Sequence, residues 1–320
     1  MRWAFVQFQN LPLSSPGKVS ILLSIFVSDI FPVFAIAAAG FLLARKLQAS
    51  VKTLAHVSFY SLTPCLAFKM LVTSKITGPE AGRMILMAVL VTAAMGLIGR
   101  VAAIPLRLNR ADLSAFLMVV MFSNGGNYGL PVVMFAFGNE ALSIGTVYFV
   151  VSAVLTYTVG VFLAAAGKQT VGQAMAGLTR VPAIYAVALA LIVLATGAPV
   201  PIMLMRPISL LSDAALPMMI IVLGMQFERA TMPERPASVA LAVVLSLLVA
   251  PLVALGLASL LSLSGSARQA GVILASMPVA VITTIFALEF DLAPAFVTSA
   301  VFISTLLSPL TLTPLLAYLT

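Results

Sequence analysis

The amino-acid sequence predicts an all-α integral membrane protein whose ten transmembrane helices form two inverted repeats of five helices each. Three observations predict this fold class: an apolar composition, ten apolar runs of membrane-spanning length, and a proline pattern that recurs in both halves. Of the 320 residues, 62% are apolar and only 8% are charged. Because so little polar surface cannot cover a soluble globule, the main solvent of this chain is lipid.

The ten apolar runs are each close to the roughly 20 residues that a helix needs to cross a bilayer. The predicted spans cover residues 20–44, 53–72, 84–105, 113–137, 142–166, 182–198, 207–227, 238–262, 269–289 and 293–318. Residues 1–19 hold only a broken apolar patch, so we expect an N-terminal tail and not a cleaved signal peptide. Residues 20–166 then form the first repeat, 167–181 a cytoplasmic linker and 182–320 the second repeat.

The basic residues lie mostly in the short segments between the apolar runs. If the N-terminus is outside, the inside segments hold nine basic residues and the outside loops hold four, or six with the tail. Membrane proteins carry an excess of positive charge inside, so we expect both termini outside, in a plasma membrane or bacterial inner membrane. The net charge of +8 then reflects topology and lipid headgroups, and we expect no nucleic-acid partner.

Prolines recur at similar intervals in the two halves, and they indicate the repeat. They are Pro32, Pro64 and Pro131 in the first half, and Pro182, Pro217 and Pro278 in the second. In each half a Phe-Ala pair follows the last proline, and an acidic residue stands five positions after the phenylalanine. Since each repeat has an odd number of spans, the second copy must enter the membrane from the opposite side, which makes the repeat inverted.

The fourth run contains the stretch FSNGGNYGLPVVMF, residues 122–135, where three glycines, two asparagines and a proline interrupt the apolar pattern. Irregular backbone survives at membrane depth only where it is buried in protein or lines a wet cavity. We expect the helix to break at residues 124–130 and a half-helix to start near Pro131. For Pro32, Pro64, Pro182 and Pro217 we expect only kinks or close helix packing.

The break predicts an anion-binding pocket at mid-membrane, because the free amides and the dipole of a helix N-terminus favour a negative group. Asn124 and Asn127 add neutral donors and acceptors, and Tyr128 adds a ring with a hydroxyl. The counterpart in the second repeat is the stretch LASMPVAVITT, residues 274–284, where Pro278 breaks the ninth span. The candidate substrate-binding residues are Asn124, Gly126, Asn127, Tyr128, Gly129, Pro131, Met277, Pro278 and Thr283.

Few ionisable groups lie within the apolar runs, and these are the candidates for ion coupling. Asp29 and Asp213 stand towards the outer ends of their spans, and Lys69 can either snorkel to the headgroups or pair with one of these acids. The sequence has no phosphate-binding Gly-x-x-x-x-Gly-Lys-Ser/Thr motif, which argues against direct ATP hydrolysis. Coupling to Na⁺, coupling to H⁺ and uniport all stay open.

Enzymatic chemistry has little support in this sequence. It contains neither a His-Glu-x-x-His motif nor paired intramembrane aspartates, so a membrane protease is disfavoured. His56 is the only histidine and Cys65 the only cysteine. Neither residue can form a metal site or a disulfide alone, and we expect no metal and no cofactor.

The order and spacing of several motifs resemble the auxin efflux carrier family, which includes the plant PIN carriers and many bacterial permeases. The motifs are IFPVFAIAAAGFLLARK, FYSLTPCLAF, Asn124-x-Gly126-x-x-Gly129-Leu-Pro131, LPMMIIVLGMQF and SAVFISTLLSPLTLTPLL. The resemblance implies a scaffold domain and a transport domain in which the broken fourth and ninth helices cross at mid-membrane. It places Asn124, Gly126, Gly129 and Pro131 in one half of the crossover and Pro278 in the other.

The function that this resemblance implies is secondary active or facilitative transport of small organic anions, either auxin-like or dicarboxylate-like carboxylates. The implied mechanism is elevator-type alternating access beside the crossover. A sodium-coupled symporter of the related bile-acid type and an anion channel are the alternatives. Two departures limit the resemblance: the segment between the halves is short, and Pro278 has no neighbouring asparagine. A homodimer stays open as a further partner.

Overall fold

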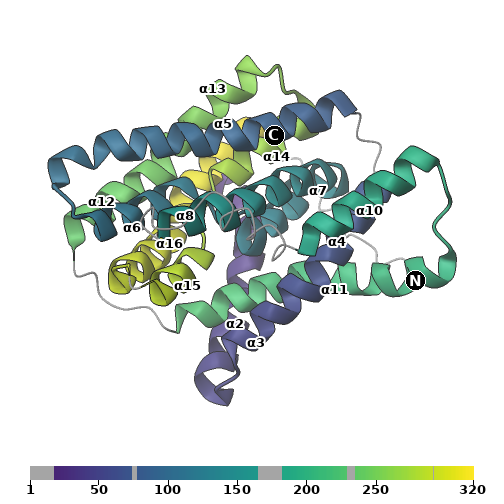
Figure 1. The fold of residues 1–320 in the computed structure, drawn as a ribbon, viewed down its shortest axis with the longest axis horizontal. Coiled ribbons are helices and arrows are strands. Elements are labelled where there is room, and N and C mark those ends of the chain that lie inside the picture. The colour runs from purple at the N-terminus through teal and green to yellow at the C-terminus, as the bar shows by residue number, and fades with distance from the viewer. Residues whose placement is uncertain (1–17, 74–77, 165–181, 229–234, 291) are drawn as a thin grey trace.

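The computed structural model describes residues 18–73, 78–164, 182–228, 235–290 and 292–320, and Figure 1 shows their arrangement. Regular structure in these residues is helical apart from one isolated antiparallel β-bridge between Ser123 and Val279. The predicted all-α class is therefore confirmed. The predicted linker at 167–181 and all but the last two residues of the predicted tail lie outside the described residues.

Each apolar run of the first half contains helix. A continuous helix comprises α1 (Lys18–Ile25), the π-helical turn η1 (Phe26–Ile30) and α2 (Phe31–Leu47), and a second comprises α3 (Val51–Val57), η2 (Ser58–Leu62) and α4 (Thr63–Val72). The following elements are α5 (Gly78–Ala102), η3 (Ile104–Leu106), α6 (Arg110–Met121), η4 (Gly125–Gly129), α7 (Leu130–Leu155), η5 (Thr156–Gly160) and α8 (Val161–Ala164).

The second half is helical over the same number of apolar runs. Its elements are α10 (Pro182–Thr196), α11 (Ile202–Phe227), α12 (Pro236–Val244), η7 (Leu245–Val249), α13 (Ala250–Leu260), α14 (Gly265–Ala275), α15 (Ile282–Glu289) and α16 (Pro294–Leu319). Helix starts follow local sequence. Asn109, for example, caps α6 by accepting a hydrogen bond from the amide of Asp112 at 2.9 Å.

Several prolines inside the apolar runs widen the helix without ending it. The π-helical turns η1, η2, η4 and η7 each end two residues before a proline, namely Pro32, Pro64, Pro131 and Pro251. A proline has no amide hydrogen and its ring crowds the carbonyl four residues back, so a wider turn relieves the clash. Pro131 therefore belongs to the same class as Pro32 and Pro64, and the half-helix does not start at it.

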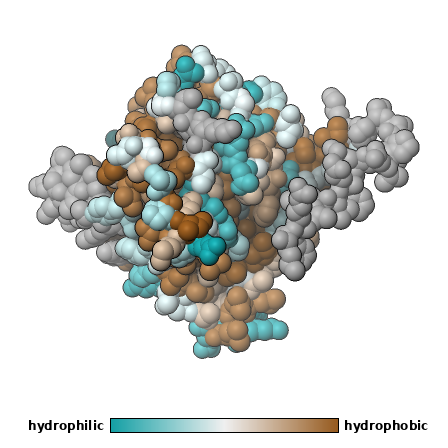
Figure 2. All heavy atoms as spheres, turned by 90° about the vertical axis from the view of Figure 1, so that its right-hand side faces the viewer, coloured by the Kyte–Doolittle hydropathy of each residue, from teal (hydrophilic) through white to brown (hydrophobic). Residues whose placement is uncertain are grey.

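Six helices are long and apolar enough to cross a membrane: Val19–Leu47, Gly78–Ala102, Gly125–Gly160, Ile202–Phe227, Pro236–Leu260 and Pro294–Leu319. Large apolar side chains such as Leu97, Met203 and Leu310 are exposed, and apolar side chains also lie on the face in Figure 2. Two of the ten predicted runs, the fourth and the ninth, are interrupted. Gly138 (φ +77°) kinks the long helix between the predicted fourth and fifth spans. The structure thus supports an integral membrane protein, and ten crossings stay a prediction.

The helices pack mainly in two groups, and each group takes matching parts of both halves. In the α2–α11 group, residues 18–72 and 182–227, α2 packs along α11 while α4 packs against α10 and α11. In the α7–α14 group, residues 78–164 and 236–319, α7 packs against α14 and α5, and α16 packs against α12 and α15. A division that draws matching elements from the two halves is what an internal repeat produces.

The centre of the α2–α11 group is a crossing at backbone contact. A Cβ added at Gly40 would lie 2.1 Å from the carbonyl oxygen of Ile221, and one added at Gly224 would lie 1.7 Å from that of Ala37. Small residues that let two backbones approach this closely are typical of helix contacts in membranes. This crossing leaves no space for a side chain between the two helices.

Candidate functional site

The fourth and ninth predicted spans are both interrupted, and the two interruptions lie side by side. Residues 122–124 separate α6 from η4, and residues 276–281 separate α14 from α15. The Asn124 amide donates to the Pro278 carbonyl at 2.7 Å, and the Ala280 amide donates to the Phe122 carbonyl at 2.8 Å. We call this pair of hydrogen bonds the bridge.

Side chains form hydrogen bonds with other backbone groups that lose their helical partners at the two interruptions. The Ser123 hydroxyl donates to the Leu274 carbonyl at 2.8 Å, and the Val279 amide donates to the Ser304 hydroxyl oxygen at 3.2 Å. Because an unpaired backbone group in hydrocarbon costs several kcal/mol, these bonds allow extended backbone to persist inside the helical packing.

The fourth run is interrupted at a different position from the one predicted. It covers residues 122–124, whereas Gly125–Gly129 form the π-helical turn η4, so the expected break at 124–130 was wrong. The half-helix accordingly starts at Gly125 and not near Pro131. The reason is that the turn widens to accommodate Pro131, and the Gly129 amide still finds the Asn124 carbonyl at 3.0 Å. The ninth-run interruption does include Pro278.

The half-helix that starts at Gly125 has an uncapped N-terminus. Asn124 stands at the N-cap position with φ −77° and ψ 60°, but its side chain makes no capping hydrogen bond. The amides of Gly126 and Asn127 lie in the first turn, where no preceding helical carbonyl can reach them. A helix start of this kind presents free N–H groups and the positive end of the helix dipole.

A cavity of about 310 Å³ lies at this N-terminus, between the two helix groups, and we call it the bridge cavity. The α7–α14 group contributes Asn124, Gly126 and Asn127, and the α2–α11 group contributes residues of η2 and α11. Among the described side chains that line it there is no lysine, arginine, aspartate or glutamate. Aromatic rings form much of the remaining wall: Phe59, Tyr60, Phe149, Tyr157, Phe286 and Phe290.

Two amide side chains that line the bridge cavity have buried atoms without a hydrogen-bond partner among the described residues. They are Nδ2 of Asn124 and Oε1 of Gln226. Asn124 is 5% exposed and belongs to the α7–α14 group, whereas Gln226 lies in the last turn of α11. A buried polar group without a partner costs about 1–3 kcal/mol, so a ligand that pairs with either atom removes that cost.

Tyr128 was predicted to line the pocket, and the structure corrects this. Its side chain is fully buried, its hydroxyl oxygen accepts a hydrogen bond from Ser308 at 3.1 Å, and its ring meets Phe34 edge-on at 6.0 Å. The π-helical turn changes the angular spacing of side chains, so Tyr128 faces the core while Asn124 and Asn127 face the cavity.

Other predicted site residues support the crossover from outside the bridge cavity. Met277 and Thr283 are fully buried, and the Thr283 hydroxyl donates to the Ala280 carbonyl at 2.6 Å. Gly129 allows close packing, because a Cβ there would lie 2.7 Å from Leu274. Pro278 contributes its carbonyl oxygen to the bridge. These four residues do not line the cavity, since the helix turns place them on the packed side.

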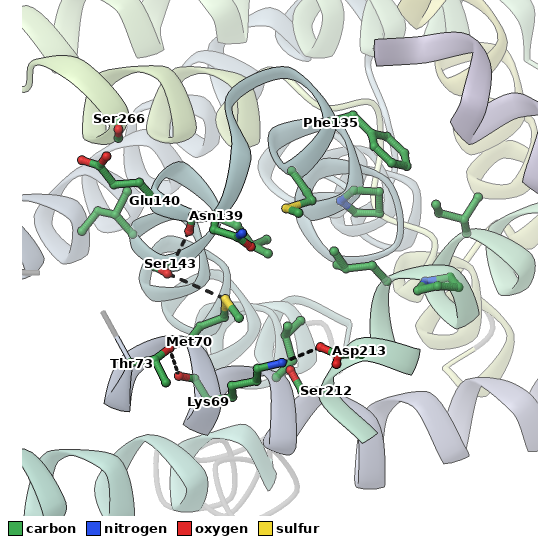
Figure 3. A pocket seen from close by; sticks show the side chains of 18 of the residues that line it. Lys69, Met70, Thr73, Phe135, Asn139, Glu140, Ser143, Ser212, Asp213 and Ser266 are labelled. Atoms are coloured by element: carbon green, nitrogen blue, oxygen red, sulfur yellow. Dashed lines mark hydrogen bonds and ion pairs between the residues drawn. The ribbon is translucent and has the colours of Figure 1, made fainter. Parts of the chain in front are cut away.

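A second, larger cavity of about 920 Å³ lies between the same two groups, and Figure 3 shows its side chains. Pro131 lines it, together with Asn139 and Glu140 of α7. Lys69 of α4 and Asp213 of α11 point towards each other there and form an ion pair at 2.5 Å. Of the two roles open to Lys69, pairing with an acid is therefore the observed one, and its partner is Asp213. Asp29 lies in η1 and lines neither cavity.

Sequence reasoning missed Gln226 and the aromatic wall of the bridge cavity. Gln226 ends the apolar run LPMMIIVLGMQF, so a lone amide at the end of a span was a signal that could have been used. The aromatic residues come from η2, α7, η5, α15 and the residue after α15. No local pattern joins segments so far apart in the sequence.

Comparisons with known proteins point to transport. A family model described as "Membrane transport protein" matches residues 25–316. An uncharacterized transporter of Methanothermobacter thermautotrophicus is 30% identical over 185 residues, which cover 58% of this chain and 61% of that protein. An uncharacterized transporter of Methanocaldococcus jannaschii is 22% identical over 206 residues, 63% of this chain and 67% of that protein. The chain thus matches less than two thirds of the length of the first of these relatives.

Proposed function

Because this chain belongs to the membrane transport protein family, we propose that it is a secondary or facilitative carrier that binds small organic anions in the bridge cavity. Membership of this family confirms the resemblance to the auxin efflux carriers. A transporter of this family has a small-molecule substrate. The identity of that substrate and the transport mechanism are the parts that we propose.

The observation that carries the proposal is the uncapped N-terminus at Gly125 beside the side-chain amide of Asn124, whose Nδ2 has no hydrogen-bond partner among the described residues. A carboxylate can accept hydrogen bonds from the free amides of the first turn and from Nδ2 of Asn124. The helix dipole adds the equivalent of roughly half a positive charge at this end. With no lysine or arginine among the described residues of the wall, the anion is held by neutral donors and can be released, as a carrier requires.

The wall of the bridge cavity favours one of the two substrate classes that the sequence left open. A dicarboxylate would bring a second negative charge against rings such as Phe59, Tyr157 and Phe286, and the described wall has no lysine or arginine to compensate it; among the described wall residues His56 is the one side chain that can carry a positive charge. Burying an uncompensated charge costs several kcal/mol. A monocarboxylate with an apolar or aromatic body instead buries its body against those rings. The proposed substrate class is therefore apolar monocarboxylates.

The proposed mechanism is elevator-type alternating access by ten helices in two inverted repeats, with the bridge at mid-membrane. The α2–α11 group acts as the scaffold, and the α7–α14 group carries the half-helix and moves. Support comes from the two cavities, which lie between these groups at opposite ends. If both termini are outside, as proposed, the bridge cavity, which Gln226 and His56 line, is on the inner side, and the larger cavity, which Glu140 lines, is on the outer side.

Ion coupling has two candidate carboxylates, Asp29 and Asp213. The Lys69 ammonium already neutralises Asp213, so a sodium ion at that carboxylate would have to displace it. Asp29 has no such cation among its described partners. Coupling to Na⁺, coupling to H⁺ and uniport therefore stay open, and the experiment below includes sodium as a variable.

The proposal is tested by the thermal stability of purified protein with phenylacetate, indole-3-acetate, malate and malonate, each with and without Na⁺. We expect the two aromatic monocarboxylates to raise the unfolding temperature and the two dicarboxylates to leave it unchanged. Asn124→Ala should abolish the shift. Asn139→Ala, the matched change on the same long helix but in the larger cavity, should retain it. A shift with dicarboxylates only, or one that only Asn139→Ala removes, would reject the proposed site.

A further inference from the structure

The bridge cavity has an unpaired donor and an unpaired acceptor among its described lining residues, one from each helix group. The donor is Nδ2 of Asn124 in the α7–α14 group, and the acceptor is Oε1 of Gln226 in the α2–α11 group. The two amides are complementary, yet neither atom has a hydrogen-bond partner among the described residues. A molecule placed between the two helix groups can pair with both.

A plain carboxylate can satisfy only one of these atoms. Its oxygens accept hydrogen bonds, so they pair with Nδ2 of Asn124 but offer nothing to Oε1 of Gln226. Met219 and Val222, the other residues of α11 in this wall, have no side-chain donor either. An acceptor left unpaired in this setting penalises every substrate that lacks a hydroxyl or N–H at that end.

We propose that Gln226 is a specificity-determining residue that accepts a hydrogen bond from a hydroxyl or N–H group on the body of the transported anion. This inference rests on the proposed function, because the carboxylate end of the substrate is assigned to Asn124. It narrows the substrate from apolar monocarboxylates to those that also carry a donor away from the carboxylate. Sites built around a buried polar group discriminate strongly against analogues that lack its partner.

The test is the affinity of purified protein for three ligands, measured by isothermal titration calorimetry. Phenylacetate has no second donor, 4-hydroxyphenylacetate carries a hydroxyl at the far end, and 4-methoxyphenylacetate carries only an acceptor there. For the wild-type chain we expect 4-hydroxyphenylacetate to bind about tenfold more tightly than phenylacetate, and 4-methoxyphenylacetate to bind no better than phenylacetate. Equal affinity for the first two ligands, or a preference for the methoxy compound, would overturn the inference.

The variant Gln226→Met keeps the length of the side chain and removes its amide. It should abolish the preference for the hydroxyl, so that 4-hydroxyphenylacetate and phenylacetate bind this variant within about threefold of each other. The matched control is Gln269→Met, because the Gln269 amide donates to the Leu319 carbonyl at 2.9 Å and does not line the cavity. This control should keep the wild-type preference.

The outcomes separate this inference from the function on which it rests. One outcome is that phenylacetate binds and loses its binding in Asn124→Ala, while 4-hydroxyphenylacetate binds the wild-type chain no more tightly than phenylacetate. In that case the proposed function stands and the role of Gln226 fails. If no carboxylate binds at all, the proposed function itself fails. The comparison of ligands on the wild-type chain gives its answer even where Gln226→Met does not fold.

Discussion

Glycines bring helices together at two places in this molecule, and they serve opposite purposes there. At the α2–α11 crossing, a Cβ at Gly40 or Gly224 would strike a backbone oxygen at 2.1 or 1.7 Å. At the bridge, a Cβ at Gly126 would meet the Phe149 ring at 2.8 Å, and one at Gly129 would meet the Leu274 side chain at 2.7 Å. The first crossing is closed by main chain, whereas the second is bounded by side chains.

This difference indicates how one fold can hold a rigid frame and an adaptable site. A backbone carbonyl inside a helix cannot move without moving the helix, but the end of a side chain can change rotamer. The α2–α11 crossing therefore fixes two helices in one position. The bridge cavity, with Phe149 in its wall, can adjust to a ligand while its backbone stays fixed by the two hydrogen bonds of the bridge.

The largest expected effect comes from Gly224→Ala, which puts a methyl group into the closed crossing. The added carbon cannot fit beside the Ala37 carbonyl, so α2 and α11 must separate, and we expect a loss of about 3 kcal/mol or more in unfolding free energy. Thermal unfolding in detergent measures it. Gly256→Ala in α13 is the control, because no heavy atom lies within 4 Å of a Cβ there. Equal stability of the two variants would remove the distinction between the crossings.

The next effect concerns binding first. Asn124→Asp keeps the shape of the side chain but places a negative charge in a cavity without a described lysine or arginine. We expect anion affinity to fall about 100-fold, since like charges brought together cost several kcal/mol. Asn124 is buried and makes no capping hydrogen bond, so the carboxylate should also lower the unfolding temperature. Calorimetric titration with phenylacetate, with exposed Asn139→Asp as the control, gives the comparison, and undiminished binding by Asn124→Asp would contradict the assignment.

A smaller effect is expected from the ion pair that joins α4 to α11. Asp213→Asn leaves the Lys69 ammonium, 20% exposed, without its partner and should cost about 1 kcal/mol. Lys69→Met should cost less, because the Asp213 carboxylate is 68% exposed and can be hydrated. The double variant should resemble Lys69→Met. Unfolding curves of the three variants measure the coupling between Lys69 and Asp213. If Asp213→Asn lowers the unfolding free energy more than Gly224→Ala does, the ion pair and not the glycine crossing is the main contact that holds α4 and α2 against α11.

The smallest effect is expected at Gly125, the first residue of the half-helix. A Cβ there would lie 3.9 Å from Leu274 and Phe149, which is ordinary contact, and alanine favours helix over glycine by up to about 1 kcal/mol. We expect Gly125→Ala to change the unfolding free energy by less than that amount. Gly126→Ala should instead displace the Phe149 ring and weaken phenylacetate binding. If the two variants behave alike in both measurements, side chains do not shape this cavity as inferred.

Much of the fold could be predicted because its causes are local. Apolar runs gave the helical segments, and the prolines marked places where the helix widens or stops. The distinction between those two outcomes was missed, since a proline such as Pro131 follows a π-helical turn within a continuing helix, while Pro278 lies in an extended segment. The outcome depends on whether a second chain segment supplies partners for the released backbone groups, as Phe122 does for Ala280.

Only those residues of the candidate site that lie together in one stretch of sequence could be named in advance. Asn124, Gly126 and Asn127 were found from one stretch of sequence, and the structure places all three in the wall of the bridge cavity. Tyr128 was assigned there wrongly, because the π-helical turn changes the direction of side chains by an amount that the sequence pattern does not reveal. Gln226 was missed because it lines the same cavity as Asn124 only when the two helix groups pack together, which the sequence does not show.

The bridge also constrains the order in which this protein can be made. Its two hydrogen bonds join residues from the first and second halves of the chain, and the first half is synthesised earlier. Until Pro278 and Ala280 leave the ribosome, the Asn124 amide and the Phe122 carbonyl have no partners, which is costly at membrane depth. The bridge can therefore form only after residues 278–280 have been synthesised, so we expect the two halves to dock late in biogenesis.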